Sequence, residues 1–167
     1  MGAYSDDIFY LQSKLKSVAI KDAVVNPKIS IIVSTLDSEQ NIANCLLSLA
    51  KQTLKEIEII VIDRGSTDYT LNLLSVFEQL DARFKVIKQN QIDLIKANNK
   101  GLEIAKGEYI SFVNSKNYIS KDFFEKIFTT AKKNNSKTAA KLTFHKTEDN
   151  KLPQLLYTKI TRNNRKG

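Results

Sequence analysis

Short runs of apolar, largely β-branched residues recur along the chain, separated by stretches long enough to form helices. The first two runs are Ile29–Val33 and Ile57–Ile62, and the next two are Phe84–Ile87 and Tyr109–Val113. Short, continuously apolar runs are typical of strands that a parallel sheet buries on both faces. Strands and helices in alternation form right-handed βαβ units within one sheet. The sequence therefore predicts an α/β fold, a Rossmann-like three-layer sandwich with a mostly parallel sheet.

Four helices are expected in the remaining stretches, over residues 42–49, 71–78, 92–105 and 121–133. Apolar residues recur in them at the spacing of a helix that packs on a core. Asp37 or Ser38 can cap the first helix, and Thr67 or Asp68 can cap the second. Gly101 weakens the third helix by about 1 kcal/mol relative to alanine.

The two ends of the chain differ from this alternating pattern. Ile8, Leu11, Leu15 and Val18 follow one another at spacings of 3, 4 and 3, which predicts one or two helical turns packed on the domain. The chain after Thr147 is polar and basic, and we expect it to fray. The predicted division is an N-terminal helical appendage over 1–26, one domain over 27–147 with a last strand over 139–145, and a basic C-terminal tail over 148–167.

Composition excludes several classes of protein. Cys45 is the only cysteine and His145 the only histidine, which excludes a disulfide framework and a Cys/His zinc site within one chain. No apolar run approaches the ~20 residues that cross a bilayer, and the N-terminus lacks the pattern of a signal peptide. A cytoplasmic protein is therefore expected.

Positive charge is concentrated in the last third of the chain. Residues 1–115 hold 13 Lys and Arg against 14 Asp and Glu, whereas residues 116–167 hold 13 against 4. The basic stretch 151–166 predicts contact with an anionic membrane surface, so that the protein would be peripheral to the membrane. Tyr157 is the only aromatic residue of that stretch, which makes nucleic acid an unlikely partner. A solvated basic tail is the simpler alternative.

Polar residues follow three of the predicted strands, at the edge where ligands bind in parallel sheets. The segments are Ser34–Glu39, Asp63–Asp68 and Asn114–Asn117. The chain has no Gly-x-Gly-x-x-Gly loop, no Gly-Lys-Ser/Thr loop and no Gly-x-Ser-x-Gly elbow, so the common dinucleotide, P-loop and serine hydrolase sites are not predicted.

Two long segments together carry a resemblance to a known family. They read PKISIIVSTLDSEQNIANCLLSLAKQTLKEIEIIVIDRGSTD and NNKGLEIAKGEYISFVNSKNYIS. From residue 27 to about 125 the chain resembles the N-terminal half of family 2 glycosyltransferases, which have the GT-A fold. The resemblance implies a site for a nucleoside diphosphate sugar. The residues that it places in this site are Ser34, Thr35, Leu36, Asp37, Glu39, Asp63, Arg64, Asn98, Asn114, Ser115 and Lys116.

Four of these positions depart from the family pattern. Leu36 stands where an aromatic residue stacks on the base, Arg64 where a carboxylate reads the base, and Asn98 where an arginine approaches the diphosphate. Lys116 replaces an acid of the Asp-x-Asp segment that holds Mg²⁺ or Mn²⁺ in the family. A lysine has three donors and no acceptor, so no metal and no other cofactor is expected here. Asp63 keeps the family's residue, although a turn residue that accepts backbone hydrogen bonds is the alternative.

Three functions remain open at this point. The first is a glycosyltransferase-like domain whose transfer of sugar from a nucleoside diphosphate sugar is impaired or lost. In the resembled family the catalytic base comes from a second half of the domain, and no such half is recognisable after Lys116. The second is an active, metal-independent transferase in which Lys116 neutralises the diphosphate. The third is a non-catalytic scaffold or membrane-surface module that uses the basic tail.

Overall fold

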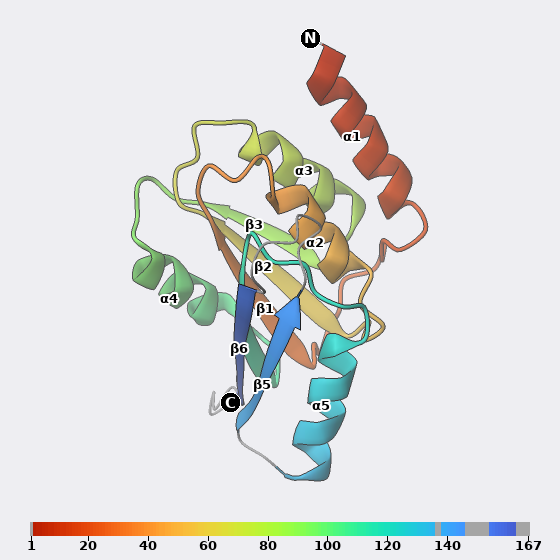
Figure 1. Ribbon diagram of the computed structural model, residues 1–167, viewed down its shortest axis with the longest axis vertical. Helices are drawn as coiled ribbons and strands as arrows, with labels where there is room; N and C mark the ends of the chain where they lie inside the picture. The colour runs from red at the N-terminus through yellow and green to blue at the C-terminus, as the bar shows by residue number, and fades with distance from the viewer. Residues whose placement is uncertain (1, 136–137, 146–153, 163–167) are drawn as a thin grey trace.

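The computed structural model describes residues 2–135, 138–145 and 154–162, with side chains described for residues 4–135. Figure 1 shows helices and strands in alternation, as the sequence predicts. The elements in chain order are α1 (Gly2–Leu15), β1 (Ile29–Thr35), α2 (Ile42–Ala50), β2 (Ile57–Asp63), α3 (Thr70–Leu80), β3 (Phe84–Lys88), α4 (Leu94–Ile104), β4 (Tyr109–Asn114), α5 (Phe123–Lys133), β5 (Thr138–His145) and β6 (Gln154–Arg162).

One six-stranded sheet has the order β3-β2-β1-β4-β6-β5. The first four strands are parallel, and β6 and β5 continue the sheet in antiparallel fashion. Ile29 of β1 pairs with Ile57 of β2 and with Tyr109 of β4, so these three strands start level with one another. Their carboxyl ends therefore lie at one edge of the sheet. The predicted α/β fold with a mostly parallel sheet is confirmed.

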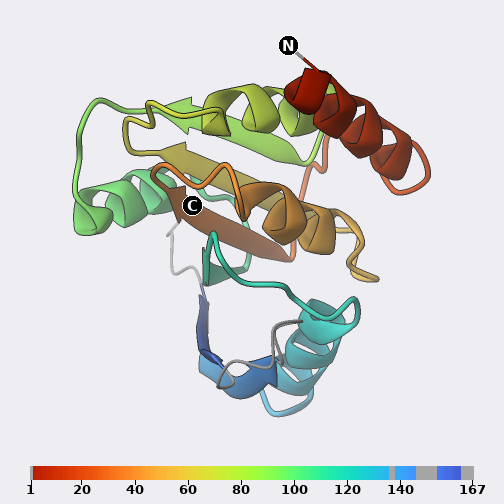
Figure 2. The ribbon, with the colours of Figure 1, turned by 45° about the horizontal axis from the view of Figure 1, so that its top comes forward.

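Helices cover both faces of the sheet, which gives the predicted three layers (Figure 2). One face buries Ile31, Val33 and Ile59 with the apolar sides of α1, α2, α3 and α5. The other face packs Ile32 and the inner residues of α4 into a smaller cluster. A Cβ atom on Gly101 of α4 would lie 2.6 Å from Cγ2 of Ile32. The glycine that weakens this helix is thus required where the helix meets β1.

The N-terminal helix is longer than the sequence predicts but packs as expected. Leu11 and Leu15 are fully buried in the larger core, and the ring centroid of Tyr4 lies 4.0 Å from that of Tyr69. Figures 1 and 2 show α1 beside α3. None of the helices in the described part of the chain combines the length and the apolar character needed to cross a bilayer.

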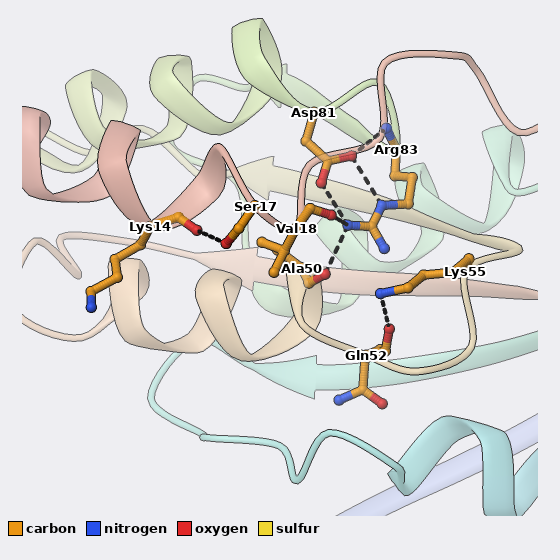
Figure 3. Close-up of polar contacts among 8 residues, drawn as sticks. All are labelled: Lys14, Ser17, Val18, Ala50, Gln52, Lys55, Asp81 and Arg83. Carbon is orange, nitrogen blue, oxygen red and sulfur yellow. Dashed lines mark hydrogen bonds and ion pairs between the residues drawn. The ribbon is translucent and has the colours of Figure 1, made fainter.

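A buried ion pair fastens the segment after α1 to the sheet (Figure 3). Arg83 Nη2 lies 2.6 Å from Asp81 Oδ2, and neither side chain is exposed. The same nitrogen donates to the carbonyl oxygens of Ala50, at 2.8 Å, and Val18, at 3.3 Å. The backbone N–H of Ala82 donates to Ile20 O at 2.7 Å. One guanidinium therefore joins the N-terminal segment, the end of α2 and the start of β3.

The C-terminal part of the chain differs from the expectation. Fraying after Thr147 is wrong for residues 154–162, because β6 pairs with β5 along its length and with β4 from Tyr109 to Ser111. The open edge of β4 presents backbone groups that a further strand can pair with. Composition of the tail alone does not reveal this partner. The expected contact of residues 151–166 with a membrane lies outside the residues whose side chains the structure describes.

Candidate functional site

The three polar segments meet at the carboxyl edge of the parallel sheet. Thr35 pairs with Asp63 at the ends of β1 and β2, and the backbone N–H of Arg64 donates to Thr35 O at 2.9 Å. On the other side of β1, the hydroxyl oxygens of Ser38 and Ser115 lie 3.2 Å apart. We use the name strand-exit site for the carboxyl ends of β1, β2 and β4 together with the residues that follow each of these strands.

The carboxylate of Asp63 closes the turn that follows β2. Asp63 is buried, and its Oδ2 accepts the backbone N–H groups of Gly65, at 3.2 Å, and Ser66, at 3.1 Å. Its Oδ1 accepts the hydroxyl of Ser66. Gly65 has a φ of 108°, and a Cβ atom there would lie 2.8 Å from the backbone nitrogen of Gln91. Asp63 therefore acts as the turn residue that the sequence left as an alternative.

Residues 37–39 and 66–70 hold each other through side-chain to backbone hydrogen bonds, and we call them the exit-loop clasp. Asp37 Oδ1 accepts the N–H of Thr67 at 2.8 Å, and Glu39 Oε2 accepts the N–H of Tyr69 at 2.8 Å. In the reverse direction, the three backbone N–H groups of residues 37–39 donate to side chains of residues 66–70. The pairs are Asp37 N with Ser66 Oγ, Ser38 N with Thr70 Oγ1, and Glu39 N with Asp68 Oδ2.

Electrostatics of the clasp favour a charged Asp68. Burial opposes the charge, but hydrogen bonds from the side chain and backbone of Thr70 and the backbone of Glu39 outweigh it and hold the pKa of Asp68 below its usual value. Asp37 adopts a positive φ of 43° to reach the clasp, a conformation that aspartate tolerates better than most residues. The acids of the clasp therefore stabilise loop structure.

Two of the predicted helix caps are corrected by the clasp. Helix α2 begins at Ile42, and its cap position is Asn41, so neither Asp37 nor Ser38 caps it. Helix α3 begins at Thr70 after Tyr69, and Asp68 Oδ1 accepts the N–H of Thr70 at 2.9 Å. The sequence rule finds a capping residue near a helix start. It does not take into account that the backbone of a second loop can bind the same side chain.

Two buried polar atoms at the strand-exit site have no hydrogen-bond partner among the described residues. They are Oγ1 of Thr35 and Nε of Arg64. Thr35 is 1% exposed and ends β1, while Arg64 follows β2 directly. Buried polar groups without partners are rare in folded proteins, and a water, an ion or another bound group can complete them. The strand order reverses between β1 and β4, where ligands bind in open α/β sheets, so Thr35 borders this point and Arg64 lies one strand away from it.

The end of β4 offers a lysine and amides in place of the acids of a metal site. Asn114 Oδ1 accepts the N–H of Lys116 at 2.9 Å, and Ser115 is buried against Ser38. Lys116 is exposed. Within residues whose side chains are described, no group of three or more His, Cys, Asp and Glu is placed to hold a metal ion. These residues do not fit Mg²⁺ or Mn²⁺, which need free oxygen ligands and usually a carboxylate.

The remaining predicted site residues lie on the two sides of β1. Ser34 donates its hydroxyl to Asn98 Oδ1 at 2.8 Å, which ties the end of β1 to α4. Leu36 is 41% exposed beside the clasp and gives the site an apolar surface without an aromatic face. The structure thus brings all eleven predicted positions to one edge of the sheet. The clasp residues Ser38, Ser66, Asp68 and Thr70 were not among them, although the run Gly65-Ser-Thr-Asp68 was a visible turn signal.

Comparison with known proteins adds independent observations. A family model described as glycosyl transferase family 2 matches residues 30–166. EpsH of Bacillus subtilis is 39% identical over 105 residues, covering 63% of this chain and 30% of EpsH. Glycosyltransferase GlyA of Streptococcus pneumoniae is 36% identical over 105 residues, covering 63% of this chain and 15% of GlyA.

A solved structure supports the same relationship. The crystal structure of S. aureus TarS 1-349 in complex with UDP-GlcNAc matches with a TM-score of 0.67 and 31% identity, covering 76% of this chain and 37% of that chain. The expected GT-A type of fold agrees with this likeness. This chain therefore spans well under half of each of these relatives. From the match over residues 30–166 and the shared fold, the chain belongs to glycosyl transferase family 2.

Proposed function

We propose that the strand-exit site binds the nucleotide part of a nucleoside diphosphate sugar, and that sugar transfer at this site is impaired or lost. Nucleotide binding is supported by the family, by the TarS structures with UDP-GlcNAc and UDP, and by the unpartnered Thr35 Oγ1 and Arg64 Nε. The loss of transfer rests on one observation, namely that a lysine, Lys116, stands after β4 at the position where the family resemblance implies a metal-ligating acid.

The charge distribution supports this proposal. The carboxylates of Asp37, Glu39 and Asp63 already accept backbone N–H groups of the loop after β2. Arg64 follows β2 and Lys116 follows β4, so these two cations lie on either side of β1 in the sheet order. A diphosphate leaving group needs positive charge at a fixed position to stabilise it. Arg64 and Lys116 together carry the charge of one divalent ion, but on two separate side chains instead of at one coordinated centre.

An active metal-independent transferase is the second candidate. The exposed ammonium of Lys116 has no ion-pair partner among the residues whose side chains are described, so it is available to a phosphate oxygen. A scaffold or membrane-surface module at the cytoplasmic side is the third, and it rests on the excess of Lys and Arg in residues 116–167. Salt-sensitive flotation with anionic liposomes tests that module, and equal flotation with neutral liposomes contradicts it.

Calorimetric titration separates the first two candidates. UDP and the other nucleoside diphosphates are titrated in Mn²⁺ and in EDTA, with the wild-type chain and with Lys116→Ala. An impaired site gives weak binding that Mn²⁺ does not strengthen, and no release of sugar from UDP-GlcNAc. A metal-independent transferase gives sugar transfer in EDTA that Lys116→Ala abolishes. Binding strengthened by Mn²⁺ in the wild-type chain contradicts both, and absence of any nucleotide binding contradicts the proposed ligand.

A further inference from the structure

A pocket outside the strand-exit site lies between α1, α2 and α3. Its volume is about 340 Å³, near the lower end of the ~300–1,000 Å³ of small-molecule sites. One wall is α1, which precedes the residues 30–166 matched by the family model. The pocket is lined by Tyr4, Asp7, Tyr10, Leu11, Glu39, Gln40, Ala43, Asn44, Tyr69 and Leu73.

The lining combines aromatic rings with negative charge. Three of the six tyrosines of the chain lie in it, and its two ionisable groups other than tyrosine are the carboxylates of Asp7 and Glu39. No lysine, arginine or histidine lines the pocket. Leu11 and Leu73 are buried and give it an apolar floor. An anionic ligand would meet two like charges here without a compensating cation.

Contacts within the chain hold the tyrosine rings of the pocket in place. The ring planes of Tyr4 and Tyr69 are tilted by 33° at a centroid distance of 4.0 Å. The backbone of Tyr69 is fixed by its hydrogen bond to Glu39 Oε2. Nζ of Lys14 lies 5.4 Å from the ring centroid of Tyr10, a cation–π contact within the chain itself. The faces of tyrosine rings attract ammonium groups because of their negative electrostatic potential.

We propose that this tyrosine pocket binds a small organic ammonium ion. The aromatic faces and the two carboxylates both favour a positive charge, and the apolar floor suits an aliphatic body attached to it. A neutral ligand would lose the attraction of Asp7 and Glu39. The pocket shares Glu39 and Tyr69 with the exit-loop clasp, but none of the cationic residues assigned to the diphosphate, so the inference does not depend on nucleotide binding.

Tyrosine fluorescence provides the assay, since the chain contains no tryptophan. The full chain is titrated with tetramethylammonium chloride, with tert-butanol as a neutral molecule of the same shape, and with sodium acetate as an anion. Sodium chloride keeps the ionic strength constant. The expected result is a saturable change with tetramethylammonium and none with the other two. No saturable change with the ammonium ion, or an equal change with tert-butanol, overturns the proposal.

Matched variants on α1 assign the signal to the pocket. Asp7→Asn removes one lining charge, whereas Asp6→Asn removes the adjacent carboxylate, which does not line the pocket. Exposed charge pairs contribute up to ~1 kcal/mol, so Asp7→Asn is expected to weaken ammonium binding by up to about fivefold. Tyr10→Ala is expected to weaken it further, and Phe9→Ala to leave it unchanged. Equal effects within either pair overturn the assignment, with far-UV circular dichroism checking that each variant folds.

Discussion

The buried guanidinium of Arg83 offers a demanding test of how the N-terminal segment is held. Arg83→Met keeps the length of the side chain but removes its charge and its donors to Asp81, Ala50 and Val18. Asp81 would remain a fully buried carboxylate without a counter-charge. Removing one partner of a buried pair typically costs about 3–5 kcal/mol. With a urea m-value of about 2 kcal/mol/M, the unfolding midpoint should fall by roughly 1.5–2.5 M.

Urea titration followed by far-UV circular dichroism measures this change. Lys85→Met is the matched control, because Lys85 is an exposed residue of β3, the strand that Arg83 directly precedes. It should alter the free energy of unfolding by less than about 0.5 kcal/mol. The double variant with Asp81→Leu should recover much of the loss, since it leaves no unpaired charge. A loss below about 1 kcal/mol for Arg83→Met alone would refute the reasoning.

Four further results are expected. Burial raises the pKa of Cys45 to about 12, so iodoacetamide should modify it at pH 8 only after unfolding, and the stability that the neutral thiol contributes should fall as pH rises from 9.0 towards 12; modification of the folded chain contradicts this. Gly101→Ala should destabilise the fold by about 1–3 kcal/mol in urea, because its Cβ meets Ile32, while the exposed Asn99→Ala should not. Asp68→Asn should lower stability at pH 7 by about 1 kcal/mol. This loss should shrink as pH falls below the usual aspartate pKa of 3.8 and disappear only below the lowered pKa of the folded state, where the wild-type carboxyl is neutral too; an undiminished loss in acid opposes the clasp. Lys116→Asp should make nucleotide binding stronger in Mn²⁺ than in EDTA by calorimetry, whereas Lys121→Asp should not, and identical metal responses would contradict the assignment of this position.

The local pattern of apolar residues in the sequence was sufficient to predict the parallel part of the sheet. Runs such as Ile29–Val33 and Ile57–Ile62 are apolar enough to require burial on both faces, so their place in the fold follows from the residues themselves. The strand β6 was missed because its pairing depends on the free edge of β4, more than forty residues earlier in the chain. The helix caps were misplaced for a related reason, since Asp37 and Thr67 are neighbours only after folding.

The sequence was sufficient to predict which positions form the candidate site, but not which interactions each side chain makes there. Asp63 matches the family residue and lies at the expected strand end, yet its oxygens accept hydrogen bonds from Gly65 and Ser66. A motif records which residue type a position keeps. It does not record how many of that residue's hydrogen bonds are already made. The unpartnered atoms of Thr35 and Arg64 could be found only in the structure.

Counting the free hydrogen-bonding groups leads to a broader inference about the strand-exit site. The acids Asp37, Glu39 and Asp63 are acceptors engaged within the exit loops, while the unpartnered Nε of Arg64 is a donor and Lys116 carries only donors. The hydrogen-bonding groups left for a ligand are therefore mainly donors. Donors suit the oxygens of a phosphate and cannot coordinate a divalent cation, so the exchange of acids for Arg64 and Lys116 changes the kind of ligand that the site can hold while the fold around it is kept.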